Sequence, residues 1–330
     1  MFAFWENLLK DSRLSQLLES VLDKGQFGFR PKDGIAEAIN ILDSAFEICQ
    51  GKIQPLTLAL IDLKKAFDSI SHASIYYSLE ALGIQSNFVN YIKALYSTPS
   101  TKLHFGGNIS RPIIPSKGVR QGDPLSPLLF DNVLRTIPEI VGVKMLAGLT
   151  NHLAYADDLV LLTSDQPGLQ NVFNIIVPVP RATGLEINIS KSLTLGWVKD
   201  GKNKRIIFDH RPLVSVNNRY LESLDINNTF KYFGVKFTPK GRSPFKSDLR
   251  DKLGVLRSAP LKPQQKLFFL VRYLIPSYLH QLTFSKIYGG TLNKLDKLIR
   301  SFTHLVLHLP HDTPKVTFHS SVRDGGVGNT

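Results

Sequence analysis

Tyr155-Ala156-Asp157-Asp158 places two adjacent carboxylates inside an apolar stretch that begins at Leu153 and continues through residues 159–162. The pattern predicts two buried strands joined by a tight turn that carries the acidic pair. Adjacent ionised carboxylates repel each other and lose hydration on burial, so a bound divalent cation is the usual remedy. An acidic pair alone is commoner in a solvated turn. The apolar flanks favour a functional site here.

A second apolar strand is predicted at residues 58–63, and it carries Asp62. Asp62, Asp157 and Asp158 would then come from two neighbouring strands. Three such carboxylates can hold two Mg²⁺ ions about 3.5–4 Å apart, with Mn²⁺ as the alternative ion. That arrangement stabilises both the attacking and the leaving oxygen in phosphoryl transfer. The prediction requires residue 62 to approach the turn at residues 157 and 158.

The charge of the chain favours a polyanionic partner. Its 330 residues carry a formal net charge of +13, and a phosphate backbone rewards clustered Lys and Arg through counterion release. An acidic membrane surface is the rival partner, although the sequence has no 18-residue apolar run and no secretory signal. Cys49 is the single cysteine, which excludes an intramolecular disulfide and a cysteine-based zinc site.

Hydrophobic spacing predicts a mixture of helices and antiparallel strands. Helices are expected at residues 8–22, 34–49, 72–96 with an interruption at Gly83, 128–137, and repeatedly after Gly241. Hairpins are expected at residues 102–115 and 153–163, strands at 193–197 and 230–237, and a loop-rich insertion at 198–228.

Five motifs follow one another along the chain. They are Ile61-Asp62-Leu63-Lys64-Lys65-Ala66-Phe67-Asp68, Gly118-Val119-Arg120-Gln121-Gly122-Asp123-Pro124-Leu125-Ser126-Pro127, Tyr155-Ala156-Asp157-Asp158, Gly184-Leu185-Glu186-Ile187-Asn188 with Lys191-Ser192, and Tyr232-Phe233-Gly234-Val235. The series resembles the reverse transcriptase domain of non-LTR (LINE-type) retrotransposons over nearly the whole chain. Residues 28–34, 261–266, 273–276, 309–314 and 324–326 are most similar to the R2 lineage.

The resemblance implies an α+β right-hand polymerase fold with truncated fingers, an antiparallel-sheet palm and a helical thumb. The expected divisions are a fingers remnant at residues 1–54, a palm with interleaved fingers elements at 55–241, a thumb at 242–310, and the start of a linker at 311–330. The implied activity is RNA-directed DNA synthesis, with an RNA template, a DNA primer or target, dNTPs and two Mg²⁺ ions as partners. A nuclear location is expected for an R2-like element.

The resemblance also implies roles for single residues. Asp62, Asp157 and Asp158 would ligate the metal ions, and the backbone carbonyl of Leu63 would join them. Lys191 would donate a proton to pyrophosphate, although a surface lysine is the plain alternative.

Three further residues would contact the incoming nucleotide. Phe67 would lie beneath the sugar and exclude a 2′-hydroxyl, whereas a core position is the commoner fate of phenylalanine. Gln121 and Gly122 would pack against the nucleotide and the template base, although Gly-Asp-Pro also forms turns in unrelated proteins. Tyr232-Phe233-Gly234 would form a hairpin that positions the primer end.

The helical tail is expected to bind a duplex through its phosphates. On helices, this segment is expected to present a basic face over an apolar face that carries three aromatic residues. The basic residues are Lys246, Arg250, Lys252, Arg257, Lys262, Lys266, Arg272 and Lys286, and the aromatic residues are Phe268, Phe269 and Tyr273. Basic amphipathic helices also bind membranes, which is the competing interpretation.

Some features depart from the family pattern. No Trp-Arg-Pro-Ile-like string, which in complete enzymes clamps the triphosphate, precedes Gln26, and the link from Pro127 to Tyr155 is short. Pro178 and Pro180 fall where a helix is expected, and an internal proline destabilises a helix by about 3 kcal/mol. Two other functions therefore stay open: a non-catalytic nucleic-acid-binding remnant, and an RNA-templated RNA polymerase.

Overall fold

Two units divide the chain in the computed structural model, Met1–Asn228 and Thr229–Thr330. The structure describes residues 25–28, 30, 32–97, 102–123, 125–134, 152–178, 183–211, 214–310 and 312–320. The helix expected at residues 8–22 lies outside these ranges. The division falls after Asn228, and the palm and thumb boundaries stay a prediction.

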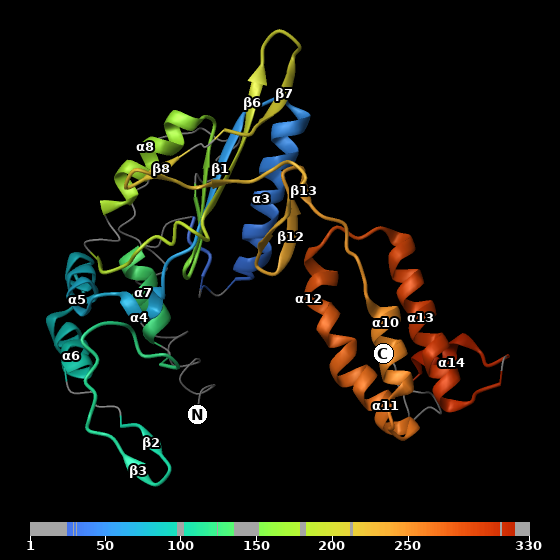
Figure 1. Ribbon diagram of the computed structural model, residues 1–330. Helices are drawn as coiled ribbons and strands as arrows, with labels where there is room; N and C mark the ends of the chain where they lie inside the picture. The colour runs from blue at the N-terminus through green and yellow to red at the C-terminus, as the bar shows by residue number, and fades with distance from the viewer. Residues whose placement is uncertain are drawn as a thin grey trace. The chain divides into compact units, whose positions relative to one another are not determined.

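A mostly antiparallel sheet forms the centre of the first unit (Figure 1). Its strands follow the order β10-β6-β1-β5-β4, with β7 paired to β6, and β10 alone runs parallel to its neighbour. The strands are β1 Leu56–Ile61, β4 His152–Tyr155, β5 Asp158–Thr163, β6 Leu193–Asp200, β7 Arg205–Asp209 and β10 Glu222–Ser223. The α+β class expected from the sequence is confirmed.

Two helices pack against the strands of this sheet, α3 Gly34–Gly51 and α8 Gln166–Ile176. The other described helices of the unit are α4 Ala66–Ser69, α5 His72–Ala81, α6 Ser86–Ser97 and α7 Leu125–Leu134. Figure 1 shows α3 and α8 on opposite sides of the strands. Side-chain caps start several of them: the carboxylate of Asp33 accepts the amide of Ala36, and that of Asp165 accepts the amide of Gly168.

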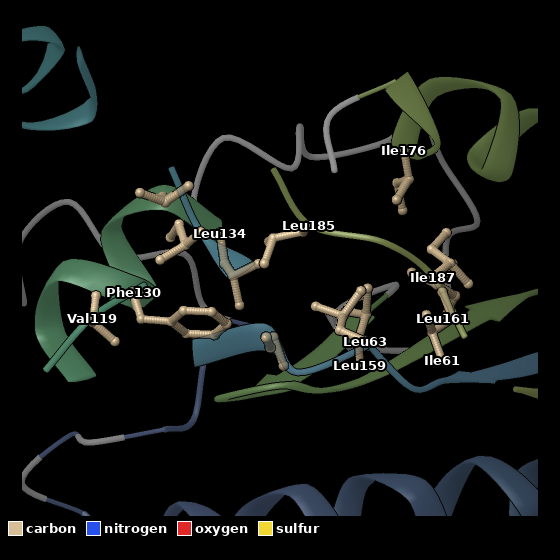
Figure 2. Close-up of a cluster of buried hydrophobic side chains, with 14 of the residues drawn as sticks. Ile61, Leu63, Val119, Phe130, Leu134, Leu159, Leu161, Ile176, Leu185 and Ile187 are labelled. Carbon is tan, nitrogen blue, oxygen red and sulfur yellow. The ribbon is translucent and has the colours of Figure 1, made fainter. Parts of the chain in front are cut away.

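The core that supports the acidic strands lies between the sheet, α7 and α8. Ile61 and Leu161 point into it from β1 and β5, and Phe130 enters from α7 (Figure 2). Leu185 and Ile187 close it from the segment before β6. Alternate residues of each strand therefore anchor the sheet, which fixes the strand register.

The second unit contains a small sheet and a group of helices. The strands are β11 Phe230–Tyr232, β12 Val235–Thr238 and β13 Gly241–Arg242, and the helices are α10 Leu249–Ser258, α11 Pro263–Phe269, η2 Leu270–Leu274, α12 Pro276–Phe284, α13 Gly289–Leu307 and α14 Lys315–His319. Strands β11 and β12 form the expected hairpin, which turns at Phe233 and Gly234 with φ of +48° and +74°. The predicted change to helical structure after Gly241 is confirmed.

One region corrects the sequence expectation. Residues 198–228 contain strands that the sequence did not indicate: β6 continues to Asp200 and pairs with β7, and two short strands, β8 Ser215–Val216 and β9 Arg219–Tyr220, follow. Strand β7 lies at an edge, where its first three residues are exposed or half-buried. Edge strands tolerate polar residues, so the sequence of β7 lacks the apolar alternation by which a strand is predicted.

Two helix ends also differ from expectation. Helix α7 begins at Leu125 rather than residue 128, because the carboxylate of Asp123 accepts the Leu125 amide at 2.9 Å. Helix α8 ends at Ile176 with Val177 as its C-cap, and Pro178, the next residue, is again helical. Pro180 lies outside the described residues. In the described part of the chain, no helix has both the length and the apolar character needed to cross a membrane.

Candidate active site

Two of the predicted carboxylates leave neighbouring strands at the same end. The β1–β5 register pairs Ile61 with Leu159, so the next residues outward are Asp62 on one strand and Asp158 on the other. Asp158 in turn pairs with Tyr155 across the β4–β5 hairpin, and Ala156 and Asp157 form the turn. Asp62 therefore lies beside the turn that carries Asp157 and Asp158.

The three carboxylates interact electrostatically. The pKa of Asp158 rises from its ordinary 3.8 to about 6 because burial removes hydration and because Asp157 and Asp62 add negative charge. The side chain still reaches solvent, so the surrounding protein only partly desolvates it. Repulsion of this kind marks a place where a cation is favoured.

The turn that carries Asp157 is held by an upstream segment. The amide of Phe27 donates to the carbonyl of Ala154, and the amide of Ala154 donates to the carbonyl of Gly25, both at 2.7 Å. Gly28 lies so close to the turn that an added Cβ would be 2.9 Å from the nitrogen of Ala156. Ala156 itself has φ of +52°, a strained value for a residue with a Cβ.

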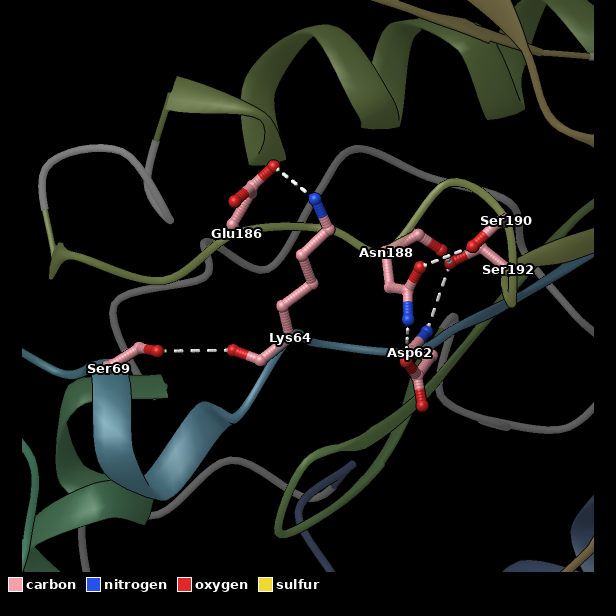
Figure 3. Close-up of polar contacts among 7 residues, drawn as sticks. All are labelled: Asp62, Lys64, Ser69, Glu186, Asn188, Ser190 and Ser192. Atoms are coloured by element: carbon pink, nitrogen blue, oxygen red, sulfur yellow. Dashed lines mark hydrogen bonds and ion pairs between the residues drawn. The ribbon is translucent and has the colours of Figure 1, made fainter.

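Asp62 is oriented by the polar loop at residues 188–192, which belongs to the fourth motif (Figure 3). The Asn188 side-chain amide donates to Oδ2 of Asp62 at 2.8 Å, and the Asn188 backbone amide donates to the Asp62 carbonyl at 2.8 Å. The Asp62 amide donates to Oγ of Ser192 at 3.1 Å. Ser190 donates to Oδ1 of Asn188 at 2.9 Å. Asp62 thus has a fixed rotamer before any ligand binds.

Leu63 and Lys64 attach the same loop to the end of β1. Leu63 forms an isolated antiparallel bridge with Ile187, and its side chain is buried. The ammonium of Lys64 is 2.6 Å from Oε1 of Glu186, although both side chains are about half exposed or more. An ion pair this exposed stabilises the folded state by only about 0–1 kcal/mol. The backbone pairing therefore contributes most to attaching this loop to β1.

The second motif docks on the short helix that follows Asp62. The amides of Gly118 and Val119 donate to the carbonyls of Ile70 and Phe67, both at 2.7 Å. Gln121 donates from Nε2 to Oδ1 of Asp68 at 2.9 Å. Gly122 has φ of +88°, with open space where a Cβ would stand. Gln121 and Gly122 therefore lie beside the segment that contains Phe67.

Phe67 is half-buried and stacks on Phe130 of α7, with ring centroids 4.5 Å apart. Phe130 therefore supports the ring, and the residue is only partly covered by the protein. Lys191 is exposed, and its backbone amide donates to the carbonyl of Asn188.

A further carboxyl group lies near the acidic turn but is buried. Burial raises the pKa of Asp131 well above its usual range, while Gln26 and Arg30 oppose that rise. An added Cβ on Gly28 would be 3.5 Å from Oδ2 of Asp131. Its burial distinguishes Asp131 from Asp62, Asp157 and Asp158, which are exposed or half-exposed.

The donors at the strand ends suit a hard divalent cation, because they are all carboxylate or carbonyl oxygens. The raised pKa of Asp158 supports the same conclusion, since a cation there would replace repulsion with attraction. Within the described ranges, however, no group of three or more His, Cys, Asp or Glu side chains is already arranged to hold a metal ion. Asp62, Asp157 and Asp158 fit the ion by chemistry rather than as a closed cluster.

Several supporting residues were not assigned a role from sequence. Asn188 and Ser192 stand inside a quoted motif, and Gly28 stands in a segment quoted only for its lineage. These residues could be located in the sequence, but their contacts could not be predicted, because each partner is more than 100 residues away in the chain. Phe130 and Asp131 lie in an ordinary apolar helix and gave no local signal.

Comparison with known proteins places these motifs in a family context. A family model described as "Reverse transcriptase (RNA-dependent DNA polymerase)" matches residues 7–237. A Pol polyprotein of an R2 retrotransposable element from Drosophila melanogaster is 38% identical over 313 residues, covering 93% of this chain and 29% of the relative. An R2 Pol polyprotein from Nasonia vitripennis is also 38% identical, with 93% and 30% covered.

This chain spans about three-tenths of the length of those two relatives. Among solved structures, the apo telomerase of Candida tropicalis matches with a TM-score of 0.46 and 13% identity, covering 93% of this chain and 48% of that one.

Proposed function

This chain belongs to the reverse transcriptase (RNA-dependent DNA polymerase) family, and we propose that it extends a DNA primer on an RNA template as part of an R2-like non-LTR retrotransposon. The observation that carries the proposal is the β1–β5 register, which places Asp62 and Asp158 at one end of adjacent strands, beside the turn with Asp157. The likeness to R2 Pol polyproteins supports the element type.

Asp62, Asp157 and Asp158 would hold two divalent ions, with the backbone carbonyl of Leu63 as a further ligand. Bound Mg²⁺ would lower the pKa of a primer 3′-hydroxyl and stabilise the charge on the triphosphate. The contribution of the chain is to position these oxygens. Asn188 fixes the Asp62 carboxylate by donating to one oxygen, which leaves the other free for a ligand.

The nucleotide site would be built around α4. Phe67, backed by the Phe130 ring, would meet the sugar and exclude a 2′-hydroxyl. Gln121 and Gly122 would face the base and the phosphates, since Gly122 has no atom within 4 Å of where a Cβ would stand. Lys191, which is exposed, would supply a proton to pyrophosphate.

The thumb role would belong to the helices after residue 242. Their Lys and Arg side chains would contact the phosphates of the template–primer duplex. Tyr232, Phe233 and Gly234 would support the primer end from the β11–β12 hairpin.

Primer extension on poly(rA)/oligo(dT) tests the proposal. The wild-type chain should extend the primer with Mg²⁺, and Asp157→Ala or Asp158→Asn should reduce the rate by about 100-fold or more. Glu47→Gln, which changes an exposed carboxylate on α3, is the matched control and should extend normally. No extension by any of these proteins, with duplex binding retained, would instead identify a non-catalytic nucleic-acid-binding remnant.

The same assay tests substrate choice. Phe67→Val should relax discrimination against ribonucleotides. If discrimination against ribonucleotides were unchanged, Phe67 would not be the residue that excludes the 2′-hydroxyl. A wild-type chain that preferred ribonucleotides would indicate an RNA polymerase.

A further inference from the structure

Three aromatic rings are exposed on one helical run of the second unit. Phe268, Phe269 and Tyr273 are 55%, 43% and 59% exposed, whereas Leu270 on the same run is fully buried. The sequence pattern had favoured a place for these rings on an apolar face beneath the basic one. Instead they lie in solvent, and clustered exposed apolar side chains mark interaction sites more often than chance.

The rings form one connected surface. Tyr273 is in contact with both phenylalanines, with centroid distances of 5.3 Å to Phe269 and 6.0 Å to Phe268. In a regular α-helix, residues four apart are neighbours but residues five apart are not. The pairing of residue 268 with residue 273 therefore reflects a wider turn.

That wider turn is the π-helical segment η2, where the amide of Ile275 donates to the carbonyl of Leu270 at 2.9 Å. Pro276 follows directly. Because proline has no amide hydrogen and its ring would clash with the preceding turn, a wider turn accommodates it. The spacing that brings these rings together, here called the aromatic surface (Phe268, Phe269 and Tyr273), therefore follows from the backbone turn.

The charge around this surface is entirely positive along the sequence. Between residues 252 and 295 the chain carries seven Lys or Arg residues and no Asp or Glu. Arg272 is adjacent to Tyr273 and exposed, and Lys262 is exposed at the start of α11. A polyanion complements this composition, and aromatic rings among cations suit nucleobases better than aliphatic partners.

We propose that the aromatic surface is a stacking platform for unpaired bases of a nucleic acid strand, with Arg272, Lys262 and their basic neighbours contacting its phosphates. Duplex binding by the thumb helices would use phosphates alone, because paired bases are already stacked on one another. The proposal goes beyond the catalytic function and does not depend on it.

Fluorescence anisotropy on the full chain tests this inference, without dNTPs. The probes are a labelled adenosine oligoribonucleotide of about 12 residues and a blunt hairpin duplex of similar length. The triple variant F268L/F269L/Y273L keeps the apolar area and removes the rings. It should bind the single strand at least about tenfold more weakly, with the same salt dependence, and the duplex as tightly as wild type.

Three further proteins complete the design. V255A/L279A, which truncates two other exposed apolar side chains of this unit, should bind the single strand normally. F268W/F269W keeps all three rings and should retain binding, which separates stacking from misfolding. Asp158→Asn should bind the single strand as wild type does, so catalytic failure and platform failure are distinguishable.

Two results would overturn the inference. One is single-strand binding that survives in the leucine variant. The other is equal loss of single-strand and duplex affinity in that variant. Binding of the wild-type chain to phosphatidylcholine–phosphatidylserine vesicles that the leucine variant retains, with no loss of oligonucleotide affinity, would assign the surface to membranes instead.

Discussion

Asp158 is the carboxylate of the site whose pKa is raised both by burial and by repulsion from its acidic neighbours. Its pKa of about 6 arises from burial first and from Asp157 and Asp62 second. Folding therefore favours the protonated form, and the ionised form destabilises the folded state. A ligand with positive charge would reverse this preference.

The raised pKa of Asp158 makes the stability of the folded chain depend on pH. Because the folded-state pKa lies above the ordinary 3.8, the folded chain binds more protons between those values, and stability falls as pH rises from about 4 to 6. Asp158→Asn should therefore raise Tm by about 1–3 °C at pH 8 and leave it nearly unchanged at pH 4. Differential scanning fluorimetry without metal measures both.

Glu47→Gln serves as the control and should not change Tm in a pH-dependent way. An equal gain from Asp158→Asn at both pH values would show that charge repulsion is not the cause. Added Mg²⁺ should stabilise the wild type more than the variant.

Asn188 is the residue that orients Asp62. Asn188→Ala removes the 2.8 Å bond to Oδ2 of Asp62 and should slow primer extension by about tenfold, since a hydrogen bond to a charged group is worth about 1.5–3 kcal/mol. The Mg²⁺ concentration for half-maximal rate should also rise. A merely structural role would not move that concentration.

Asn203→Ala is the matched control, because Asn203 makes the same kind of bond to Asp200 at 2.6 Å in the β6–β7 turn. Its extension rate and Mg²⁺ requirement should equal those of wild type. If Asn188→Ala behaved in the same way, the orienting role would be wrong.

At the scale of elements, the site depends on loops that dock by backbone pairing. Residues 118–119 pair with α4 and the residue after it, and residues 186–188 pair with the end of β1. Gly118 permits the first contact: its φ is +88°, and an added Cβ would be 3.0 Å from the backbone of Asp68. Glycine alone satisfies both demands.

Replacing this glycine should therefore be costly. Gly118→Ala should lower the free energy of unfolding by about 2–4 kcal/mol, from backbone strain plus the close contact. Gly122→Ala has the same φ of +88° but open space around the added Cβ, so it should lose only the strain component. Urea denaturation of both variants measures the difference, and equal losses would refute the close-contact explanation.

The elements with local signals could be predicted from sequence. Helix α3 was predicted because its apolar spacing is regular, and the break between α5 and α6 was predicted at Gly83, whose φ is +70°. Residues 198–228 could not be predicted, because β7 is an edge strand and β10 pairs with β6 in parallel from a distant position. Pairing between distant segments leaves little trace in a short window of sequence.

The same distinction applies to the site. The acidic turn and Asp62 were predicted from their apolar flanks, and the register places them together. The bond from Asn188, the approach of Gly28 to Ala156 and the stacking of Phe130 on Phe67 were not predicted. Each is a contact between residues far apart in sequence, and the residue type alone does not reveal it.

The net charge of +13 on the complete chain suits the proposed binding of nucleic acid. The first unit holds the carboxylates and the loops that orient them. The second carries a basic helical stretch and the aromatic surface. This chain spans about three-tenths of the length of its R2 relatives. The activity of those longer proteins is therefore proposed for this chain.

Electron paramagnetic resonance of Mn²⁺ bound to the full chain with a primer–template tests whether Asp62 and Asp158 ligate the same metal site. Asp62→Asn, Asp158→Asn and the double variant should each weaken Mn²⁺ binding by about tenfold or more, and the double variant should lose little beyond the worse single variant, because both residues would serve one site. Unchanged Mn²⁺ binding in either single variant, or strictly additive losses in the double variant, would contradict a shared metal site at the ends of β1 and β5.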